Sequence, residues 1–446
     1  MDAKVSGNVR LKKVRTGVTL AANGIPSSMR KWFLLLLCVL SHGAFACTAF
    51  VHTHNGRTLV GCNEDAWSIN AQVRFVQGRN GDHGAIYFDH FNGHPLREQG
   101  PQMGMNEAGL VFDGLSIQPL EVKPVPGRQL VRFDDLMPML MRTCATVHEA
   151  ATRMRTYDFS WLTRSMLFFA DRNGDYLIVE NDTMIMGHDP TYAVGNWRMG
   201  TCIDPATIPI PRLQAGRELL LSGNVASFEE AENVLSTMTV CRERLGEGTL
   251  FSVLFDPRSA QAHLYFYHDM RERVTFDLQA ELAKGDRTLP MPALFGDRPE
   301  YGSLLAYKTP FHQRWLWWAI AGVGLLSLLG IACAVGLFVI WMIACIRSRS
   351  FITELQWLLV GTSSALAAFL CAALLVHESV YYFGLGEAVE RFHPLLVWAP
   401  SVLSAFIILV VVHTLRHARH RGSLRVVAAL HGSLIIGLAY WGLLFP

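Results

Sequence analysis

No CxxC pair occurs among the nine cysteines of the chain, and the formal net charge is only +2. The first absence argues against a zinc ribbon, and the second gives no reason to expect a nucleic-acid partner. His52 and His54 fall on one face of a predicted strand, but no carboxylate or third ligand is evident nearby. We therefore expect neither a metal site nor a cofactor.

Charged residues are scarce in the last third of the chain, which explains a hydrophobic content of 51% over 446 residues. Four apolar segments there each reach the roughly 20 residues that a membrane helix needs. They are Trp315 to Ile346, Leu355 to His377, Pro394 to Leu415 and Val426 to Phe445. The sequence predicts a membrane domain of four helices over residues 315–446.

Arginines flank these segments unevenly, and the bias predicts an orientation. The first and third short loops carry Arg347, Arg349, Arg416, Arg419, Arg421 and Arg425 and are expected on the cytoplasmic side. The second loop, Glu378 to His393, carries three acids and one arginine and is expected outside. Residues 47–314 would then face outward, on the periplasmic or extracellular side of a cytoplasmic membrane.

A short leader near the N-terminus predicts the same topology. Met29-Arg30-Lys31 is a positive n-region, and Trp32 to Leu40 is an apolar stretch too short to span a bilayer. Ala44-Phe45-Ala46 is a small-x-small cleavage site, so we expect residues 1–28 to be an extension, 29–46 a signal peptide, and Cys47 the mature N-terminus.

A cysteine at a new N-terminus carries a thiol and a free α-amine on one residue. The amine has a reference pKa of about 7.7–8.0 and can accept the proton of the thiol, and the thiolate is a nucleophile. Acylation of Cys47 as a lipoprotein cysteine and a purely structural role remain open alternatives. Ala44 at the −3 position, where Leu is usual, speaks against acylation.

The residues after Cys47 predict a β-hairpin. Thr48 to His54 and Arg57 to Cys62 flank Asn55-Gly56, a strong two-residue hairpin signal. This turn pairs His54 with Arg57, and counting outward places Cys47 opposite Glu64. Cys62 is then a diagonal neighbour of Cys47, while Asn63 and Asp65 fall on the other face.

From Cys47 the chain resembles the linear-amide C–N hydrolases, a group of N-terminal-nucleophile (Ntn) enzymes that includes penicillin V acylases and choloylglycine hydrolases. The resemblance covers roughly Cys47 to Met270. The matching segments are Cys47-Thr48, Gly61-Cys62-Asn63-Glu64-Asp65 followed by Trp67, Met105-Asn106-Glu107-Ala108-Gly109-Leu110, Phe169 to Asp175 with Val179-Glu180, Asn196, and Pro211-Arg212-Leu213.

The resemblance implies roles for six residues. Cys47 would be the nucleophile, Asp65 the acid that orients it, Asn196 the oxyanion donor and Arg212 a supporting charge. Ser116 would offer a backbone amide to the oxyanion, and Asn106 is a weaker substrate-binding candidate because it also suits a turn. Purely structural roles remain open for three of them: Asp65 as a capping carboxylate, Asn196 as a turn residue and Arg212 as a solvated residue at a helix start.

Two departures leave the substrate open. The bile-salt members have Arg where this chain has Cys62, and Ser116 stands in place of Asn or Tyr. Cys62 would either fill that space or form a disulfide with Cys47 that silences the nucleophile.

The expected fold is α+β, an αββα four-layer Ntn sandwich over residues 47–298 followed by the four membrane helices. Strands are expected at Gly84 to Phe91, Leu110 to Leu115, Ser165 to Ala170, Tyr176 to Glu180, Thr249 to Leu254 and Ala262 to Tyr267. One or two helices are expected over Arg132 to Arg155. Further helices are expected over Arg212 to Leu221 and Ser227 to Thr237, the last with a capping box. The Pro- and Gly-containing stretch Glu281 to Tyr307 is expected to be a linker. Between the sandwich domain and the membrane domain, we assign residues 299–314 to this linker.

The predicted activity is hydrolysis of a linear N-acyl amide by an outward-facing, membrane-anchored enzyme. Proximity to the bilayer favours a lipid-like small-molecule substrate such as an N-acyl amino acid or an acyl-homoserine lactone. An acyltransferase on the same fold and a non-catalytic membrane sensor or transport component are the alternative functions.

Overall fold

The computed structural model describes most of the chain after the leader. The described residues are 47–66, 70–91, 101–118, 124–181, 183–223, 225–240, 248–348, 355–376, 378, 380–385, 394–416 and 421–444. The predicted signal peptide and N-terminal extension, Trp67 and most of the second membrane loop lie outside the described residues.

The predicted hairpin is present. β1 (Thr48–His54) and β2 (Arg57–Ala66) pair antiparallel, with His54 opposite Arg57 and Thr48 opposite Asn63. Asn55 and Gly56 both have positive φ, 49° and 74°, as the tight hairpin turn requires. The predicted register is therefore confirmed, and it directs Cys47 toward Glu64.

Two antiparallel sheets form the centre of the domain. Among the described residues the first sheet has six strands in the order β12-β1-β2-β13-β14-β15. Its other strands are β12 (Thr191–Gly195), β13 (Gly248–Asp256), β14 (Gln261–Phe266) and β15 (Asp269–Asp277).

The second sheet has eight strands among the described residues, in the order β11-β10-β9-β6-β5-β4-β3-β16. They are β3 (Asn70–Val76), β4 (Ala85–Phe91), β5 (Met103–Asn106), β6 (Val111–Ser116), β9 (Ser165–Ala170), β10 (Tyr176–Val179), β11 (Met184–Gly187) and β16 (Arg287–Pro290). A short parallel pair, β7 (Gln129–Leu130) and β8 (Tyr157–Asp158), lies apart.

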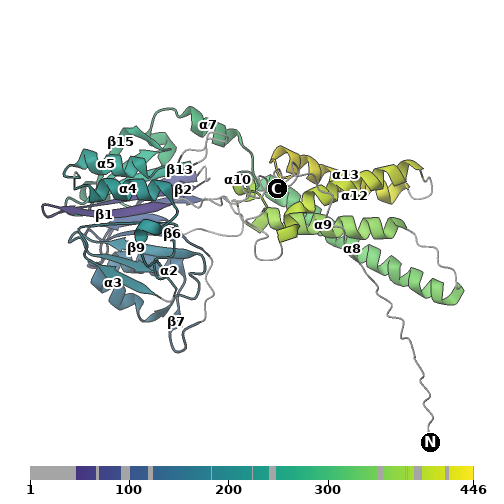
Figure 1. Cartoon of the computed structure of the whole chain (residues 1–446), viewed down its shortest axis with the longest axis horizontal. Helices are drawn as coiled ribbons and strands as arrows, with labels where there is room; N and C mark the ends of the chain where they lie inside the picture. The colour runs from purple at the N-terminus through teal and green to yellow at the C-terminus, as the bar shows by residue number, and fades with distance from the viewer. Residues whose placement is uncertain are drawn as a thin grey trace, which may run out of the picture. The chain divides into compact units, whose positions relative to one another are not determined.

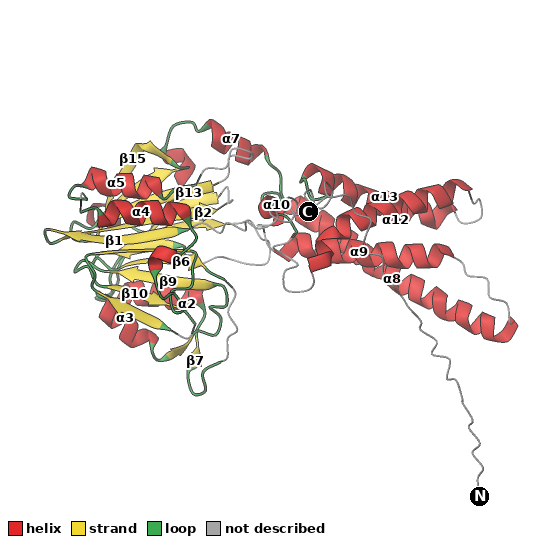
Figure 2. Ribbon diagram, viewed as in Figure 1, coloured by secondary structure: helices red, strands yellow, loops and turns green. Residues whose placement is uncertain are grey.

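The sheets stack face to face, and helices cover both outer faces (Figures 1 and 2). Between the sheets, the ring of Phe88 on β4 packs edge-on against Phe255 on β13, with centroids 5.7 Å apart. α4 (Pro211–Leu221) and α5 (Phe228–Thr237) cover the six-stranded sheet, and α2 (Phe133–Thr143) and α3 (Val147–Met154) cover the eight-stranded one. The domain therefore has the αββα layering expected from the sequence.

Local signals set the helix ends. Ser227 caps α5: its side chain accepts from the Glu230 backbone amide while the Glu230 carboxylate accepts from that of Ser227, so the predicted capping box is confirmed. Thr146 caps α3 in the simpler way, accepting from Glu149. The predicted helical stretch Arg132 to Arg155 is thus split into α2 and α3.

The prediction that Glu281 to Tyr307 is a linker is wrong. The chain there adds β16 to the edge of the eight-stranded sheet against β3, with Arg287 opposite Phe75. The segment also holds the 3-10 turn Met291–Leu294 and α7 (Pro299–Ala306). Tyr301 and Leu304 of α7 are buried in the domain core. The unpaired edge of β3 offers hydrogen bonds to β16, and the apolar side chains of α7 are stabilised by burial.

The C-terminal third is helical. The main helices are α8 (Arg314–Ser348), α9 (Leu355–Val376), α12 (Ala399–Arg416) and α13 (Arg421–Tyr440), with shorter turns α10 (Val380–Phe383) and η3 (Pro394–Trp398). Within the described residues, Arg314–Ile343 and Leu358–Val376 are long and apolar enough to cross a membrane. Leu396–Val412 and Arg425–Tyr440 are shorter apolar helices, so two of the four predicted spans meet this criterion.

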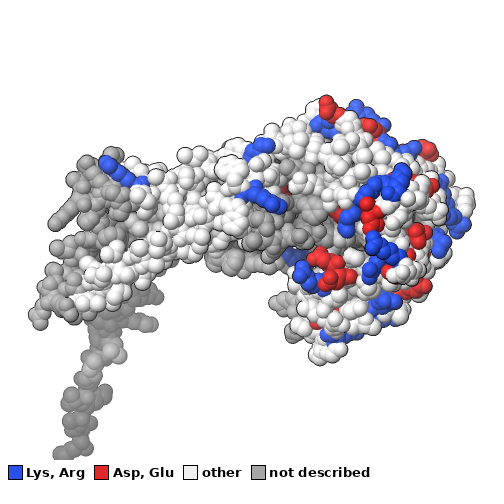
Figure 3. Space-filling view, turned by 180° about the vertical axis from the view of Figure 1, so that it is seen from behind, with Lys and Arg blue, Asp and Glu red and all other residues white. Residues whose placement is uncertain are grey.

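Surface charge follows the same division. On the face shown in Figure 3, charged side chains gather over the sheet domain, whereas the described part of the helical region carries few of them. Large apolar side chains are exposed on α8, among them Leu329, Phe338 and Ile340. Such an exposed apolar surface is typical of helices that contact lipid or a partner.

The side chain of Asn106 joins the second sheet to α2. Its side-chain amide donates to the carbonyls of Met141 and Cys144, and its oxygen accepts from the Leu110 amide. We expect Asn106→Ala to destabilise the fold by about 2–4 kcal/mol, because three buried partners lose their bonds. Thermal unfolding of the detergent-solubilised chain measures this; Asn173→Ala, at an exposed turn position, is the control. Equal stability of the two variants would contradict the assignment.

Candidate active site

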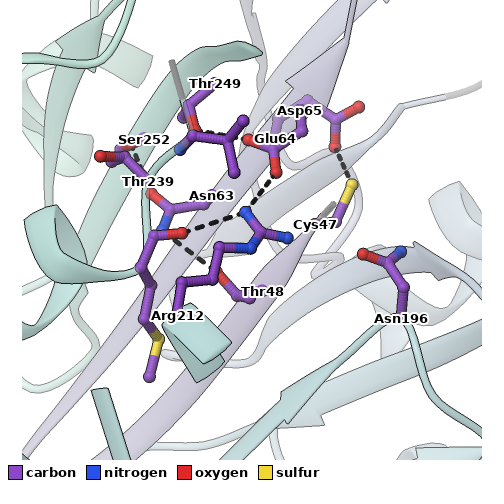
Figure 4. A network of polar contacts seen from close by, with 12 residues as sticks. Cys47, Thr48, Asn63, Glu64, Asp65, Asn196, Arg212, Thr239, Thr249 and Ser252 are labelled. Carbon is purple, nitrogen blue, oxygen red and sulfur yellow. Dashed lines mark hydrogen bonds and ion pairs between the residues drawn. The ribbon is translucent and has the colours of Figure 1, made fainter. Parts of the chain in front are cut away.

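Cys47 lies directly before β1, with 6% of its surface exposed. Its Sγ donates a hydrogen bond to Glu64 Oε2 over 3.5 Å. Figure 4 shows this contact beside a network of polar contacts that includes Asn63, Asp65 and Arg212, with the side chain of Asn196 near the sulfur. Both Cys47 and Cys62 are free thiols in the structure, which shows no disulfide between them.

Glu64 is held by a histidine from the opposite sheet. His90 Nε2, on β4, lies 3.0 Å from Glu64 Oε1 in an ion pair, and the side chains are 15% and 4% exposed. Burial alone lowers the pKa of His90, but the hydrogen bond and charge of Glu64 outweigh it, so the pKa lies above its usual 6.5. One carboxylate oxygen therefore faces a sulfur and the other an imidazolium.

Asp65 points away from Glu64, because successive side chains on a strand alternate. Arg212 Nη1, on α4, donates to Asp65 Oδ2 over 2.7 Å and also to the Met238 carbonyl over 3.1 Å. The Thr249 hydroxyl donates to the other oxygen, Oδ1. The predicted association of Arg212 with Asp65 is thus present as a buried ion pair.

The ionisation of Asp65 reflects a balance between burial and this pair. Burial raises the pKa of Asp65 from 3.8 to about 6, although Arg212 and Thr249 pull it down. The contact seen at the Cys47 sulfur is that of Glu64, so the orienting role predicted for Asp65 stays a prediction.

Asn63 ties β2 to its neighbours on the helix-covered face. Its amide nitrogen donates to Thr48 Oγ1 over 3.1 Å and to the Leu235 carbonyl on α5 over 3.0 Å. Ser252 on β13 donates its hydroxyl to the Asn63 oxygen. These bonds hold β1, β2, β13 and α5 in one position at the end of the hairpin where Cys47 lies.

Asn196 directly follows β12, the strand on the other side of β1. Because Thr48 pairs with Gly195, the next residue, Asn196, lies beside Cys47 (Figure 4). Its amide nitrogen donates to the Ser116 carbonyl over 2.7 Å, and its buried Oδ1 has no hydrogen-bond partner among the described residues. The role of oxyanion donor predicted for Asn196 stays a prediction.

Asp113 is a third buried carboxyl group. It lies on β6 of the eight-stranded sheet, is 0% exposed, and interacts with the thiol of Cys62 and the backbone of Gly114. Among the described residues no cationic side chain forms an ion pair with it. Burial, and then the charge of Glu64, raise the pKa of Asp113 well above its usual range.

The environment of Cys47 favours the neutral thiol over the thiolate. Burial raises the pKa of Cys47 well above 9.0, and the nearby Glu64, Asp65 and Asp113 carboxylates raise it further. A hydrogen bond from the Asp65 backbone opposes them but does not prevail. Nucleophilic attack by this sulfur therefore requires a base.

The structure thus brings together five of the six predicted site residues: Cys47, Asp65, Asn196, Arg212 and Ser116. The sixth, Asn106, uses its side chain to join the β5–β6 turn to α2, and no contact supports its predicted role in substrate binding. Among the described residues no group of three or more His, Cys, Asp or Glu side chains is arranged to hold a metal ion.

Sequence reasoning did not identify Glu64, His90 or Asp113 as members of the site. Glu64 was within reach, because the hairpin register places it opposite Cys47. His90 and Asp113 come from other strands of the second sheet, and no local pattern marks them.

Comparisons with known proteins give matches to solved structures. No protein-family model and no curated protein sequence matches the chain. A mutant conjugated bile acid hydrolase from Clostridium perfringens aligns at 14% identity and a TM-score of 0.42, over 55% of this chain and 96% of its own. A penicillin V acylase from Agrobacterium tumefaciens aligns at 14% identity and a TM-score of 0.41, over 52% of this chain and 86% of its own.

The Asp65–Arg212 pair gives a pH-dependent prediction. Folded Asp65 holds its proton up to about pH 6, whereas an unfolded carboxyl loses it near 3.9. Above about pH 6 the buried carboxylate is charged and needs its cation. We therefore expect Arg212→Gln to cost about 3 kcal/mol near pH 7.5 and much less near pH 5.

Unfolding of wild type and Arg212→Gln at both pH values measures this difference. Arg172→Gln, at an exposed turn position, should cost little at either pH. A cost for Arg212→Gln that grows toward acid pH would show that the pair does not work as described.

Proposed function

We propose that the chain is a membrane-anchored amidase that hydrolyses a linear N-acyl amide, with Cys47 as its N-terminal nucleophile. The observation that carries the proposal is the convergence at Cys47 of residues far apart in the sequence. The sulfur, the Asn196 amide beside Ser116 and the buried Asp65–Arg212 pair all lie at one end of the six-stranded sheet.

Proteolysis after Ala46 would supply the missing base. The freed α-amine of Cys47 would accept the thiol proton while the sulfur attacks the carbonyl carbon and forms the C–S bond. The Asn196 side chain, and the backbone amide of Ser116, would donate to the oxyanion. The protonated amine would then give its proton to the leaving nitrogen as the C–N bond breaks.

The second half of the reaction consumes water. A water molecule, losing its proton to the Cys47 amine, would attack the thioester and release the acid and the free thiol. Asp65, kept ionised above about pH 6 and paired with Arg212, would keep β2 and the end of the hairpin fixed throughout. The chemistry needs no group beyond the chain itself and water.

The helical region would anchor this site at the membrane. The arginine distribution, the two apolar helices and the leader all support an outward-facing domain on a multi-pass membrane protein. A site held beside the bilayer suits a lipid-like N-acyl amide. An N-acyl amino acid and an acyl-homoserine lactone are two examples.

Cys47→Ser tests the nucleophile. We expect wild type to release free amine from a panel of N-acyl substrates and Cys47→Ser to be slower by about 100-fold or more, because a serine hydroxyl is much less acidic than a thiol. Amine release is followed by reaction with an amine-specific dye. Cys62→Ser is the matched control and should retain activity. Equal rates for wild type and Cys47→Ser would remove the amidase proposal.

Leader removal is tested separately. N-terminal sequencing of the purified chain should begin at Cys47. Ala46→Leu replaces the small residue that the cleavage site requires, so this variant should keep its leader and lose amidase activity. An active, uncleaved chain would show that the α-amine is not the base.

A further inference from the structure

The sulfur of Cys47 faces an anion. The group that accepts its hydrogen bond is Glu64 Oε2, at 3.5 Å, and the carboxylate is 4% exposed. The cation that pairs with Glu64, His90, binds the other oxygen, Oε1. The positive charge is therefore on the far side of the carboxylate from the sulfur.

A second carboxyl group, that of Asp113, lies near enough to interact electrostatically with Glu64. Asp113, from the opposite sheet, is completely buried and forms no ion pair among the described residues. Both Asp113 and Glu64 raise the pKa of the Cys47 thiol, because each disfavours a negative charge on the sulfur. Arg212, on the opposite face of β2, is bound to Asp65.

We propose that Glu64 selects against a carboxylate on the leaving amine, so that this site accepts amides whose amine is neutral or cationic. The proposal rests on the amidase function above and specifies its substrate. Of the two examples given there, it favours the neutral acyl-homoserine lactone and disfavours the anionic N-acyl amino acid.

The geometry of attack explains the selection. The scissile carbonyl carbon must come within about 3–3.5 Å of the sulfur, and the α-carboxylate of an amino-acid leaving group is only three bonds from that carbon. Such a carboxylate therefore lies no further than about 11 Å from Glu64 Oε2, where repulsion at an effective dielectric constant of about 20 is worth about tenfold in kcat/KM. An apolar acyl chain carries no charge and is unaffected.

Three substrates with one acyl chain test the proposal on the full-length, detergent-solubilised protein. Decanoylglycine has an anionic leaving amine, decanoylethanolamide a neutral one and monodecanoylputrescine a cationic one. We expect kcat/KM for decanoylglycine to be lower than for the other two by about tenfold or more. In Glu64→Gln, which keeps the shape and lets His90 donate to the new amide oxygen, this difference should shrink several-fold.

Glu218→Gln is the matched control, because Glu218 is exposed on α4, and it should leave the ratio unchanged. Amine release that is lost in Cys47→Ser but shows no lower kcat/KM for decanoylglycine would overturn the proposed charge selection and leave the proposed amidase function standing. A lower kcat/KM for decanoylglycine that Glu64→Gln does not reduce would have the same meaning. Absence of Cys47-dependent release from all three substrates would overturn both.

Alkylation of Cys47 tests the charge effect without any substrate or variant. Iodoacetamide is neutral and iodoacetate anionic, and each transfers its carbon to the thiolate with loss of iodide. The ratio of their rates at Cys47, read from the alkylated N-terminal peptide by mass spectrometry, should exceed the ratio for glutathione several-fold. Equal ratios for Cys47 and glutathione would show that no nearby anion repels an anionic reagent from the sulfur, and this result would overturn the proposal.

Discussion

The hydrogen-bond register between β1 and β2 is the constraint on which the site depends. The two-residue turn at Asn55-Gly56 fixes which residues face one another along the hairpin. It thereby directs Cys47 toward Glu64. A slip of one residue would turn every side chain of β2 to the opposite face. Asn63 reinforces this register from the side, because its amide joins β1 and α5 while it accepts from Ser252 on β13.

Alternation along β2 divides its polar residues between two environments. Cys62 and Glu64 face the second sheet, where they meet Asp113 and His90. Asn63 and Asp65 face the helices, where they meet the carbonyl of Leu235 and the guanidinium of Arg212. Two neighbouring carboxylates therefore have different contacts: Glu64 contacts the sulfur of Cys47, whereas Asp65 binds Arg212 and so fixes the strand to α4. Because side chains alternate along a strand, the single segment Cys62 to Asp65 contacts both the second sheet and the helical layer.

Features encoded locally could be predicted from the sequence. The hairpin follows from Asn55-Gly56, the start of α5 from the Ser227–Glu230 capping box, and the position of Cys47 from counting along the register. Contacts between distant strands could not be predicted in this way. His90 reaches Glu64 only because β4 lies in the sheet stacked on β2, and β16 forms only because β3 has an unpaired edge. Composition suggested a linker around Pro290, but proline is tolerated at a sheet edge, where its missing N–H costs nothing.

Burying several carboxyl groups beside one thiol requires compensation, and the structure supplies it unevenly. His90 balances Glu64 and Arg212 balances Asp65, but Asp113 has no cationic partner among the described residues, and the thiol is held in its neutral form. An ammonium group at Cys47 would add one positive charge where carboxylates predominate, which favours its protonated form. The proposed cleavage would thus change the charge balance of the site as well as supply a base. An amine that holds its proton tightly must lose it before it can accept the proton of the thiol, so the electrostatics favour turnover at a pH above the ordinary range of an α-amine.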